Sequence, residues 1–216
     1  MESKELTKEE VYHILFYLEE IDRGSYGIVK KVNNDTCIKI YYKDIFNTYA
    51  KRDINALDED VNLLIKVYED TSSDKNTQEI RENERKKLEY LHKIGLVKRV
   101  LTYKGYMIGI EMNYYEDYIP LNKARDYLEK ENYKEVLYRI RTKLDEFLKN
   151  NIFPQDLSRS NILINIKTLD IVFIDLDDCY TRYEDDDYLA KKPLVKQSLF
   201  DRCNKKYREI EKNINN

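Results

Sequence analysis

Three side chains in the last third of the chain have the types and the spacing to position a hydroxyl group and a cation. Asp156 and Asn161 are five positions apart in a loop that precedes the apolar run Ile162-Leu163-Ile164. Asp175 follows a second apolar run, residues 171–174. A carboxylate can accept a hydroxyl proton, and an amide oxygen is a ligand for hard cations. Each segment taken singly is also typical of a loop residue that caps a turn, but the two together favour a shared site.

A pair of glycines near the start of the chain suits a turn that approaches phosphate groups. Gly24-Ser25-Tyr26-Gly27 precedes Ile28-Val29, and glycine lets backbone N–H groups come close to phosphate oxygens. Lys39 lies one hairpin later, in the run Thr36-Cys37-Ile38-Lys39-Ile40-Tyr41, which places it under the same turn. The alternatives are an ordinary hairpin turn and a lysine on the solvent face of a strand.

Glu84 is the candidate partner for a buried cation. It precedes Leu88 by four positions and Leu91 by seven, so it belongs to the apolar stripe of a helix predicted over residues 77–93. A carboxylate on that stripe requires a cation, and Lys39 is the candidate. A surface ion pair with a neighbouring Arg or Lys is the alternative, and Glu79 and Glu82 are rivals for the role.

The sequence predicts both strands and helices as the elements that hold these residues. Strands are predicted in the region of residues 16–41, with a turn at 33–35, and over 96–112, 162–164 and 171–174. Helices are predicted over 44–70, 77–93 and 133–149, and from Pro193 to about 212, because proline favours the first helical position. The expected fold class is α+β. It has a β-rich N-lobe over residues 1–112 and a helical C-lobe over 113–216, and the lobes meet near 112–118.

The composition limits the classes of partner. Lys and Arg number 38 and Asp and Glu number 41, which gives a net charge of −3 and no general attraction to nucleic acid. No run of residues has the length and apolarity of a membrane span, and the three cysteines show neither disulfide nor zinc spacing. A protein soluble in a reducing compartment is expected.

Taken in order, these segments resemble the protein-kinase-like superfamily over residues 16–178. Gly24-Ser25-Tyr26-Gly27-Ile28-Val29 is similar to the glycine-rich loop, and Cys37-Ile38-Lys39 to the third-strand lysine motif. Glu84 resembles the glutamate that pairs with this lysine. The segment from Asp156 to Asn161 resembles the catalytic loop, and Asp175-Leu176-Asp177 resembles the metal-binding triplet.

The resemblance implies a bilobal fold, ATP and Mg²⁺ as cofactors, and a role for each residue. Asp156 is then the catalytic base, Lys39 holds the α- and β-phosphates, and Asn161 and Asp175 hold the metal. The implied nucleotide-binding residues are Gly24, Ser25, Gly27, Val29, Lys39, Glu84, Met112 and Tyr114. The last two belong to a predicted hinge whose backbone binds adenine.

The sequence also departs from the kinase pattern. Asp22 replaces the first glycine of the loop, Pro154-Gln155 replaces the usual His-Arg before the catalytic Asp, and Asp177 replaces the glycine of the triplet. Only 41 residues follow Asp175 (216 − 175), and they contain no activation segment with its usual anchor. The chain therefore resembles minimal, atypical bacterial kinases, especially small effector kinases that are secreted into host cells.

Three functions follow from the resemblance. The first is a constitutively active Ser/Thr protein kinase that acts as a monomer on a cellular or host protein, in the cytoplasm or after secretion into a host cytosol. The second is a kinase for a small hydroxylated molecule. The third is a kinase-shaped module that binds a protein without catalysis, which the three departures favour.

Overall fold

The computed structural model describes residues 3–23, 27–41, 87–103, 105–176, 179 and 193–215. The chain divides into two units, Met1–Glu116 and Asp117–Asn216. The boundary drawn from the sequence, between residues 112 and 113, precedes this division by a few residues. Each unit is described by itself below.

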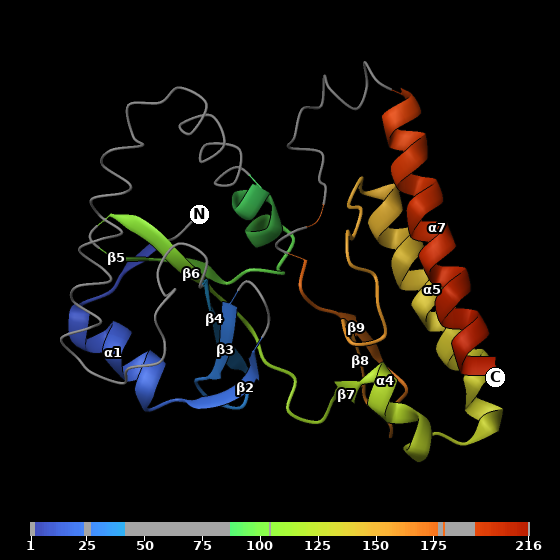
Figure 1. The fold of residues 1–216 in the computed structure, drawn as a ribbon, viewed down its shortest axis with the longest axis horizontal. Helices are drawn as coiled ribbons and strands as arrows, with labels where there is room; N and C mark the ends of the chain where they lie inside the picture. Colours follow the sequence, from blue (N-terminus) through green and yellow to red (C-terminus); the bar gives the residue numbers. More distant parts are fainter. Residues whose placement is uncertain are drawn as a thin grey trace. The chain divides into compact units, whose positions relative to one another are not determined.

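The first unit is built on a mixed six-stranded sheet with the order β1-β5-β6-β4-β3-β2 (Figure 1). All neighbours are antiparallel except β1 and β5, which are parallel. The strands are β1 (Ser3–Glu5), β2 (Glu19–Arg23), β3 (Gly27–Lys31), β4 (Thr36–Tyr41), β5 (Arg99–Tyr103) and β6 (Tyr106–Asn113). The strands predicted from the sequence in this region are confirmed, and the first of them begins at Glu19 rather than near residue 16.

Charged residues occupy the two edges of this sheet. The edge strand β1 has only exposed residues, and β2 consists mainly of exposed charged ones. Exposed charges on edge strands oppose pairing with another chain. The central strand β4, in contrast, is buried over five of its six residues. Its β-branched and apolar residues explain why it was predicted with its observed bounds.

A helix that the sequence analysis did not predict covers one face of the sheet. Helix α1 (Lys8–Phe16) begins with a capping box, in which the Thr7 hydroxyl accepts from the Glu10 N–H and the Glu10 carboxylate accepts from the Thr7 N–H. Its apolar residues Val11, Ile14 and Leu15 pack in one core. The sheet residues of that core are Ile28, Ile38, Ile40, Leu101, Tyr103 and Ile108.

The described part of the predicted helix over residues 77–93 is residues 87–93, and it is helical. Leu88 and Leu91 are buried, as their spacing predicted. The predicted helix over 44–70 lies outside the described residues.

The second unit combines a three-stranded sheet, order β7-β8-β9, with helices (Figure 1). Its strands are β7 (Ile119–Pro120), β8 (Ile162–Ile164) and β9 (Ile171–Phe173). Its helices are α4 (Leu121–Ala124), η1 (Arg125–Tyr127), η2 (Lys130–Asn132), α5 (Tyr133–Lys149) and α7 (Pro193–Asn215). The α+β fold class is therefore confirmed.

Helix α5 organises the core of this unit. Its bounds are those predicted. The predicted stripe is buried at Leu137, Ile140, Leu144 and Leu148, and its first residue, Tyr133, is half-buried. Phe147 on α5 contacts Phe173 on β9 edge to face, with ring centroids 5.4 Å apart. This contact fixes the helix against the β8–β9 hairpin.

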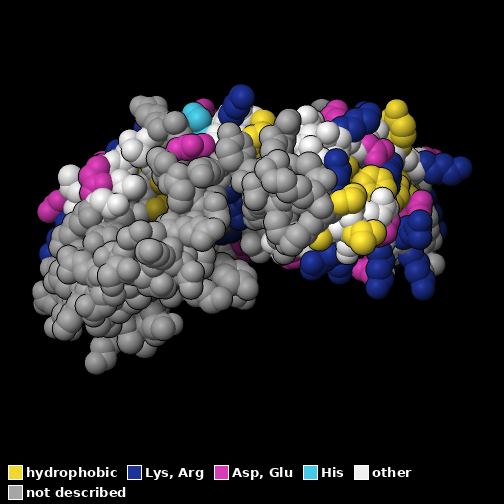
Figure 2. Space-filling model, turned by 90° about the horizontal axis from the view of Figure 1, so that it is seen from above, with side chains coloured by type: hydrophobic (Ala, Val, Ile, Leu, Met, Phe, Trp, Pro, Cys, Tyr) yellow, Lys and Arg dark blue, Asp and Glu magenta, His cyan; other side chains and the backbone are white. Residues whose placement is uncertain are grey.

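Helix α7 packs along α5 and extends three residues beyond the predicted end. The Arg141 guanidinium on α5 donates to the Asn204 side chain at 2.6 Å, and the Tyr207 hydroxyl donates to the Leu137 carbonyl oxygen at 3.3 Å. Lys and Arg side chains are numerous on the face of this unit seen at the right of Figure 2. None of the described helices combines the length and apolarity that crossing a membrane requires.

Candidate functional site

Lys39 is a buried lysine in the middle of a central strand. Only 8% of its surface is exposed, so it is not the solvent-facing lysine of the alternative interpretation. It pairs across the sheet with Val29 on one side and with Ile110 on the other. Because paired residues of neighbouring strands share a face, Lys39 lies with Val29 and Ile110, opposite the face that α1 covers. Its ammonium lies 5.7 Å from the centroid of the Tyr41 ring.

The second buried lysine of the sheet, Lys30, has a structural explanation. Its ammonium donates to the Leu18 carbonyl oxygen at 3.4 Å and to the Glu20 carboxylate at 3.5 Å. Glu20 also binds Arg23 at 2.6 Å, and this ion pair holds the pKa of the Glu20 carboxyl below its usual value. Lys30 thus closes the edge of the sheet.

Gly27 brings two backbones together beside Lys39. A Cβ atom at this position would lie 2.5 Å from the Ile40 carbonyl oxygen, closer than such atoms approach in proteins. The glycine is therefore required by the close approach of β3 to β4. Val29 follows two residues later on the same strand, and its partner is Lys39 itself. The turn predicted at residues 24–27 is described only at Gly27, which begins β3.

The predicted hinge residues Met112 and Tyr114 lie at the end of β6 and just after it. Met112 pairs with Cys37 in the ladder between β6 and β4. The Tyr114 N–H donates to the Asp35 carbonyl oxygen at 3.0 Å, and the Tyr114 ring lies under the Lys31 ammonium at 4.7 Å. The Tyr114 N–H thus already has an acceptor within the first unit.

Three of the predicted nucleotide-binding residues, Gly24, Ser25 and Glu84, lie outside the described residues. The same holds for Asp177, the departure at the end of the metal-binding triplet. Asp22, the departure in the glycine loop, is described: its carboxylate accepts from the Arg23 N–H at 2.8 Å.

In the second unit, the loop that carries Asp156 is fixed on both sides by buried residues. Ile152 and Phe153 precede the aspartate, Leu157 follows it, and all three are buried. The Cys203 thiol of α7 contacts the Pro154 carbonyl oxygen at 3.7 Å, and burial raises the pKa of this thiol to about 11. Asp156 itself is exposed. A carboxylate at a fixed position that faces solvent suits a group that must meet a substrate.

Asp156 and Asn161 meet directly. The side-chain amide of Asn161 donates to the Asp156 carboxylate at 2.9 Å and to the Asp156 carbonyl oxygen at 3.0 Å. Because the amide nitrogen is used in this way, the amide oxygen of Asn161 is the atom left for a cation. The pair predicted from a five-residue spacing is thus brought together by the structure.

Asp175 lies at the same end of the β8–β9 hairpin. Ile162 pairs with Phe173, and the Ile174 N–H donates to the Asn161 carbonyl oxygen at 2.9 Å, so the next residue, Asp175, emerges beside Asn161. Asp175 has a φ of 58°, in the left-handed region that residues with a Cβ atom seldom adopt. Backbone strain of this kind concentrates at functional sites.

The second unit thus carries two hard oxygen donors, from Asn161 and Asp175, and the further carboxylate of Asp156 at one end of the β8–β9 hairpin. An amide oxygen and a carboxylate suit Mg²⁺, which is held by few protein ligands and keeps several waters. Within the described ranges, no three His, Cys, Asp or Glu side chains are grouped so as to hold a metal. An amide oxygen and a single carboxylate are donors of the kind that Mg²⁺ can share with the oxygens of a substrate phosphate.

Two structural features of the candidate residues, one in each unit, were not predicted from the sequence. The left-handed backbone at Asp175 has no sequence signal, because glycine, which usually marks such a conformation, is missing there. The close contact at Gly27 depends on the pairing with β4. The sequence analysis also missed α1, although Thr7 and Glu10 have the spacing of a capping box.

Comparison with known proteins does not assign the chain to a family. No protein-family model matches the chain, and no curated protein does.

Proposed function

We propose that this protein is a minimal phosphotransferase of the protein-kinase-like kind, which moves the γ-phosphate of ATP to a hydroxyl group of a protein. The observation that carries the proposal is the arrangement of Asp156, Asn161 and Asp175. A 2.9 Å side-chain hydrogen bond joins the first two, and a 2.9 Å backbone hydrogen bond places the third beside them. The buried Lys39, with Val29 as its strand partner, supports it from the first unit.

In this proposal each residue has a task in phosphoryl transfer. Asp156 orients the acceptor hydroxyl and takes its proton; one of its carboxylate oxygens accepts from Asn161, which fixes the orientation of the group. The Asn161 amide oxygen and the Asp175 carboxylate hold Mg²⁺, and Lys39 neutralises the charge of the phosphates. ATP and Mg²⁺ supply the phosphoryl group and the charge neutralisation that the transfer requires.

A transfer assay tests the proposal. The protein is incubated with labelled ATP, Mg²⁺ and cell-lysate proteins, and labelled products are identified by mass spectrometry. We expect Asp156→Ala to lower the rate by about 10²–10⁴-fold, the usual contribution of a general base. Asp175→Ala is expected to lower it and to raise the Mg²⁺ concentration needed. Asp126→Ala, which removes an exposed carboxylate of η1, is the matched control and should leave the rate unchanged.

Two results would reject the proposal: no transfer to any lysate protein by the wild type, or full transfer by Asp156→Ala. Transfer to a small hydroxylated molecule without any protein product would move the function to a metabolite kinase. Tight binding of a protein that neither Asp156→Ala nor Asp175→Ala weakens would indicate a binding module.

A further inference from the structure

The backbone that follows β6 is fastened to the turn between β3 and β4, residues 32–35. The Tyr114 N–H donates to the Asp35 carbonyl oxygen at 3.0 Å, although Tyr114 comes after the last residue of β6 and is outside the sheet ladder. The preceding residue, Asn113, is held as well, because its carbonyl oxygen accepts from the Cys37 thiol at 3.4 Å. Residues of two neighbouring segments thus fix the backbone at Asn113 and Tyr114.

Lys98 holds the acceptor of the Tyr114 hydrogen bond. Its ammonium donates to the same Asp35 carbonyl oxygen at 2.8 Å and to the Thr36 hydroxyl oxygen at 2.6 Å. It also lies 3.7 Å from the Asp35 carboxylate, which accepts from the Thr36 hydroxyl at 2.6 Å. The Thr36 hydroxyl and the Lys98 ammonium hold the pKa of the Asp35 carboxyl below its usual value. One cation thus contacts two consecutive residues at three oxygen atoms.

The surroundings of Lys98 strengthen these contacts. Thr36 is buried, and the Lys98 side chain is 30% exposed. Hydrogen bonds that involve a charged group are stronger than neutral ones, and partial exclusion of water strengthens them further. The Lys98 N–H donates to the Glu111 carbonyl oxygen at 2.8 Å, so the backbone of Lys98 is fixed to β6 itself. Lys98 therefore links β6 to the turn that receives the Tyr114 N–H.

We propose that Lys98 is a positioning residue for nucleotide binding, which fixes the backbone of Asn113 and Tyr114 through the Asp35 carbonyl oxygen. This inference rests on the proposed function, in which the backbone of the segment 112–114 binds the nucleobase. The role requires no contact between Lys98 and the nucleotide. A binding segment that is held in place beforehand loses less conformational entropy when its ligand binds.

Hydrogen exchange of the Tyr114 amide tests whether Lys98 holds this segment. Lys98→Met removes the ammonium and keeps an unbranched side chain, whereas Lys98→Arg keeps a charged donor. NMR of the full chain without nucleotide measures the exchange rate, which reports how readily the hydrogen bond opens. We expect Lys98→Met to raise this rate about 10-fold, the effect of losing a hydrogen bond to a charged group, and Lys98→Arg to restore most of the protection.

The kinetics of the transfer assay test the consequence for the nucleotide. Lys98→Met should raise the KM for ATP about 10-fold and leave kcat close to that of the wild type, because the lost interaction serves ground state and transition state alike. A purely structural defect would lower the amount of folded enzyme, and therefore kcat, at an unchanged KM. Lys98→Arg should recover most of the affinity for ATP.

Lys4→Met is the matched control, because Lys4 also forms an ion pair in the first unit, with Glu10 at 2.8 Å. It should change neither the exchange rate nor the KM. Circular dichroism establishes that the variants are folded. If Lys98→Met unfolds, Thr36→Val replaces it, because it removes the hydroxyl that accepts from Lys98, and both quantities should change in the same direction.

The outcomes separate this inference from the proposed function. Calorimetry first establishes whether the wild type binds ATP with Mg²⁺. If it does, an unchanged Tyr114 exchange rate or an unchanged KM in Lys98→Met would overturn the positioning role, and an equal effect of Lys4→Met would do the same. If the wild type binds no ATP, the proposed function fails and the nucleotide-binding role of Lys98 fails with it.

Discussion

The strained backbone at Asp175 gives the most specific test of how the proposed site is built. Asp175 has a φ of 58° and an exposed side chain. Replacing it by Gly or by Ala removes the same carboxylate and the same contacts, so the two variants differ only in the Cβ atom. Their difference in the free energy of unfolding therefore measures the cost of holding a residue with a Cβ atom in the left-handed conformation.

The magnitude follows from two opposing contributions. A Cβ atom in the left-handed region costs roughly 1–2 kcal/mol. Glycine loses more backbone entropy on folding, which costs roughly 0.5–1 kcal/mol. Asp175→Gly should therefore be more stable than Asp175→Ala by about 0.5–1 kcal/mol, the difference between these costs. At a position with negative φ only the second contribution acts, and the order of the two variants reverses.

Urea-induced unfolding followed by circular dichroism measures both pairs of variants. Asp156 supplies the control pair, because it lies in the same site and is not among the described residues with positive φ. There Asp156→Ala should be the more stable variant by about 0.5–1 kcal/mol. An Asp175→Ala protein at least as stable as Asp175→Gly would refute the reasoning. Under the proposed function, both Asp175 variants should be defective in the transfer assay, although one of them is the more stable protein.

Three further predictions concern the first unit. Gly27→Ala should lower the free energy of unfolding by about 1–3 kcal/mol in urea titrations, because the new Cβ would lie 2.5 Å from the Ile40 carbonyl oxygen; an unchanged midpoint would contradict this close approach. Burial raises the pKa of the Cys37 thiol to about 11, so iodoacetamide should label it far more slowly in the native protein than in urea at pH 8, and equal rates would show that the thiol is accessible. The Arg23 guanidinium lowers the pKa of Glu20, so this pair stabilises the protein above pH 4.5 and the contribution is lost as the pH falls through the lowered pKa. Glu20→Gln should accordingly be less stable than the wild type at pH 7, and thermal melts should show the gap closing in acid.

Local patterns were sufficient for the central elements of both units. The strand Thr36–Tyr41 and the helix Tyr133–Lys149 were predicted with their observed bounds. Each has a strong periodic or compositional signal, and the tertiary structure buries the residues that this signal marks. The pair Asp156 and Asn161 was also predicted from a local pattern. The two residues are only five positions apart, and so short a loop can bring their side chains together.

Elements that depend on distant partners were not predicted. The strand Ser3–Glu5 has three exposed residues and exists because it pairs with Arg99–Tyr103, almost a hundred positions away. The segment Ile119–Pro120 is a strand only because it pairs with β8. Helix α1 is a different case, because its capping box was present in the sequence and was overlooked.

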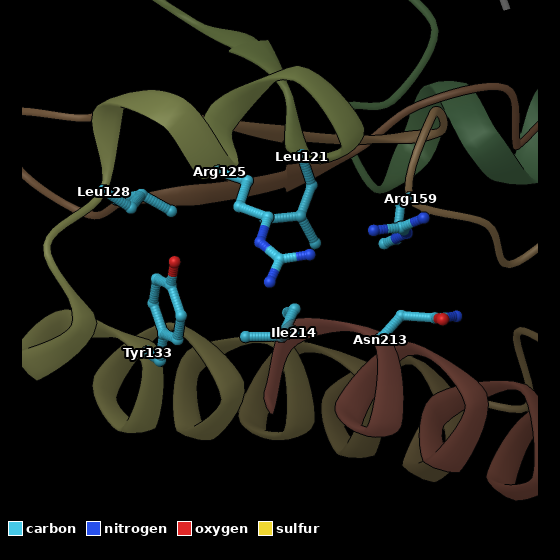
Figure 3. Close-up of a pocket in the computed structure, with 7 residues that line it drawn as sticks. All are labelled: Leu121, Arg125, Leu128, Tyr133, Arg159, Asn213 and Ile214. Atoms are coloured by element: carbon cyan, nitrogen blue, oxygen red, sulfur yellow. The ribbon is translucent and has the colours of Figure 1, made fainter. Parts of the chain in front are cut away.

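The sequence by itself determined which residues can do chemistry, because residue types and short spacings specify donors, acceptors and charges. Only the tertiary structure decided that Lys39 is buried on the face opposite α1, and that Asp175 is held in the left-handed conformation. It alone joined Arg125 and Arg159 with the end of α7 around one small pocket (Figure 3). Burial, strain and pockets arise from contacts between segments far apart in the chain, and no local pattern of residues encodes those contacts.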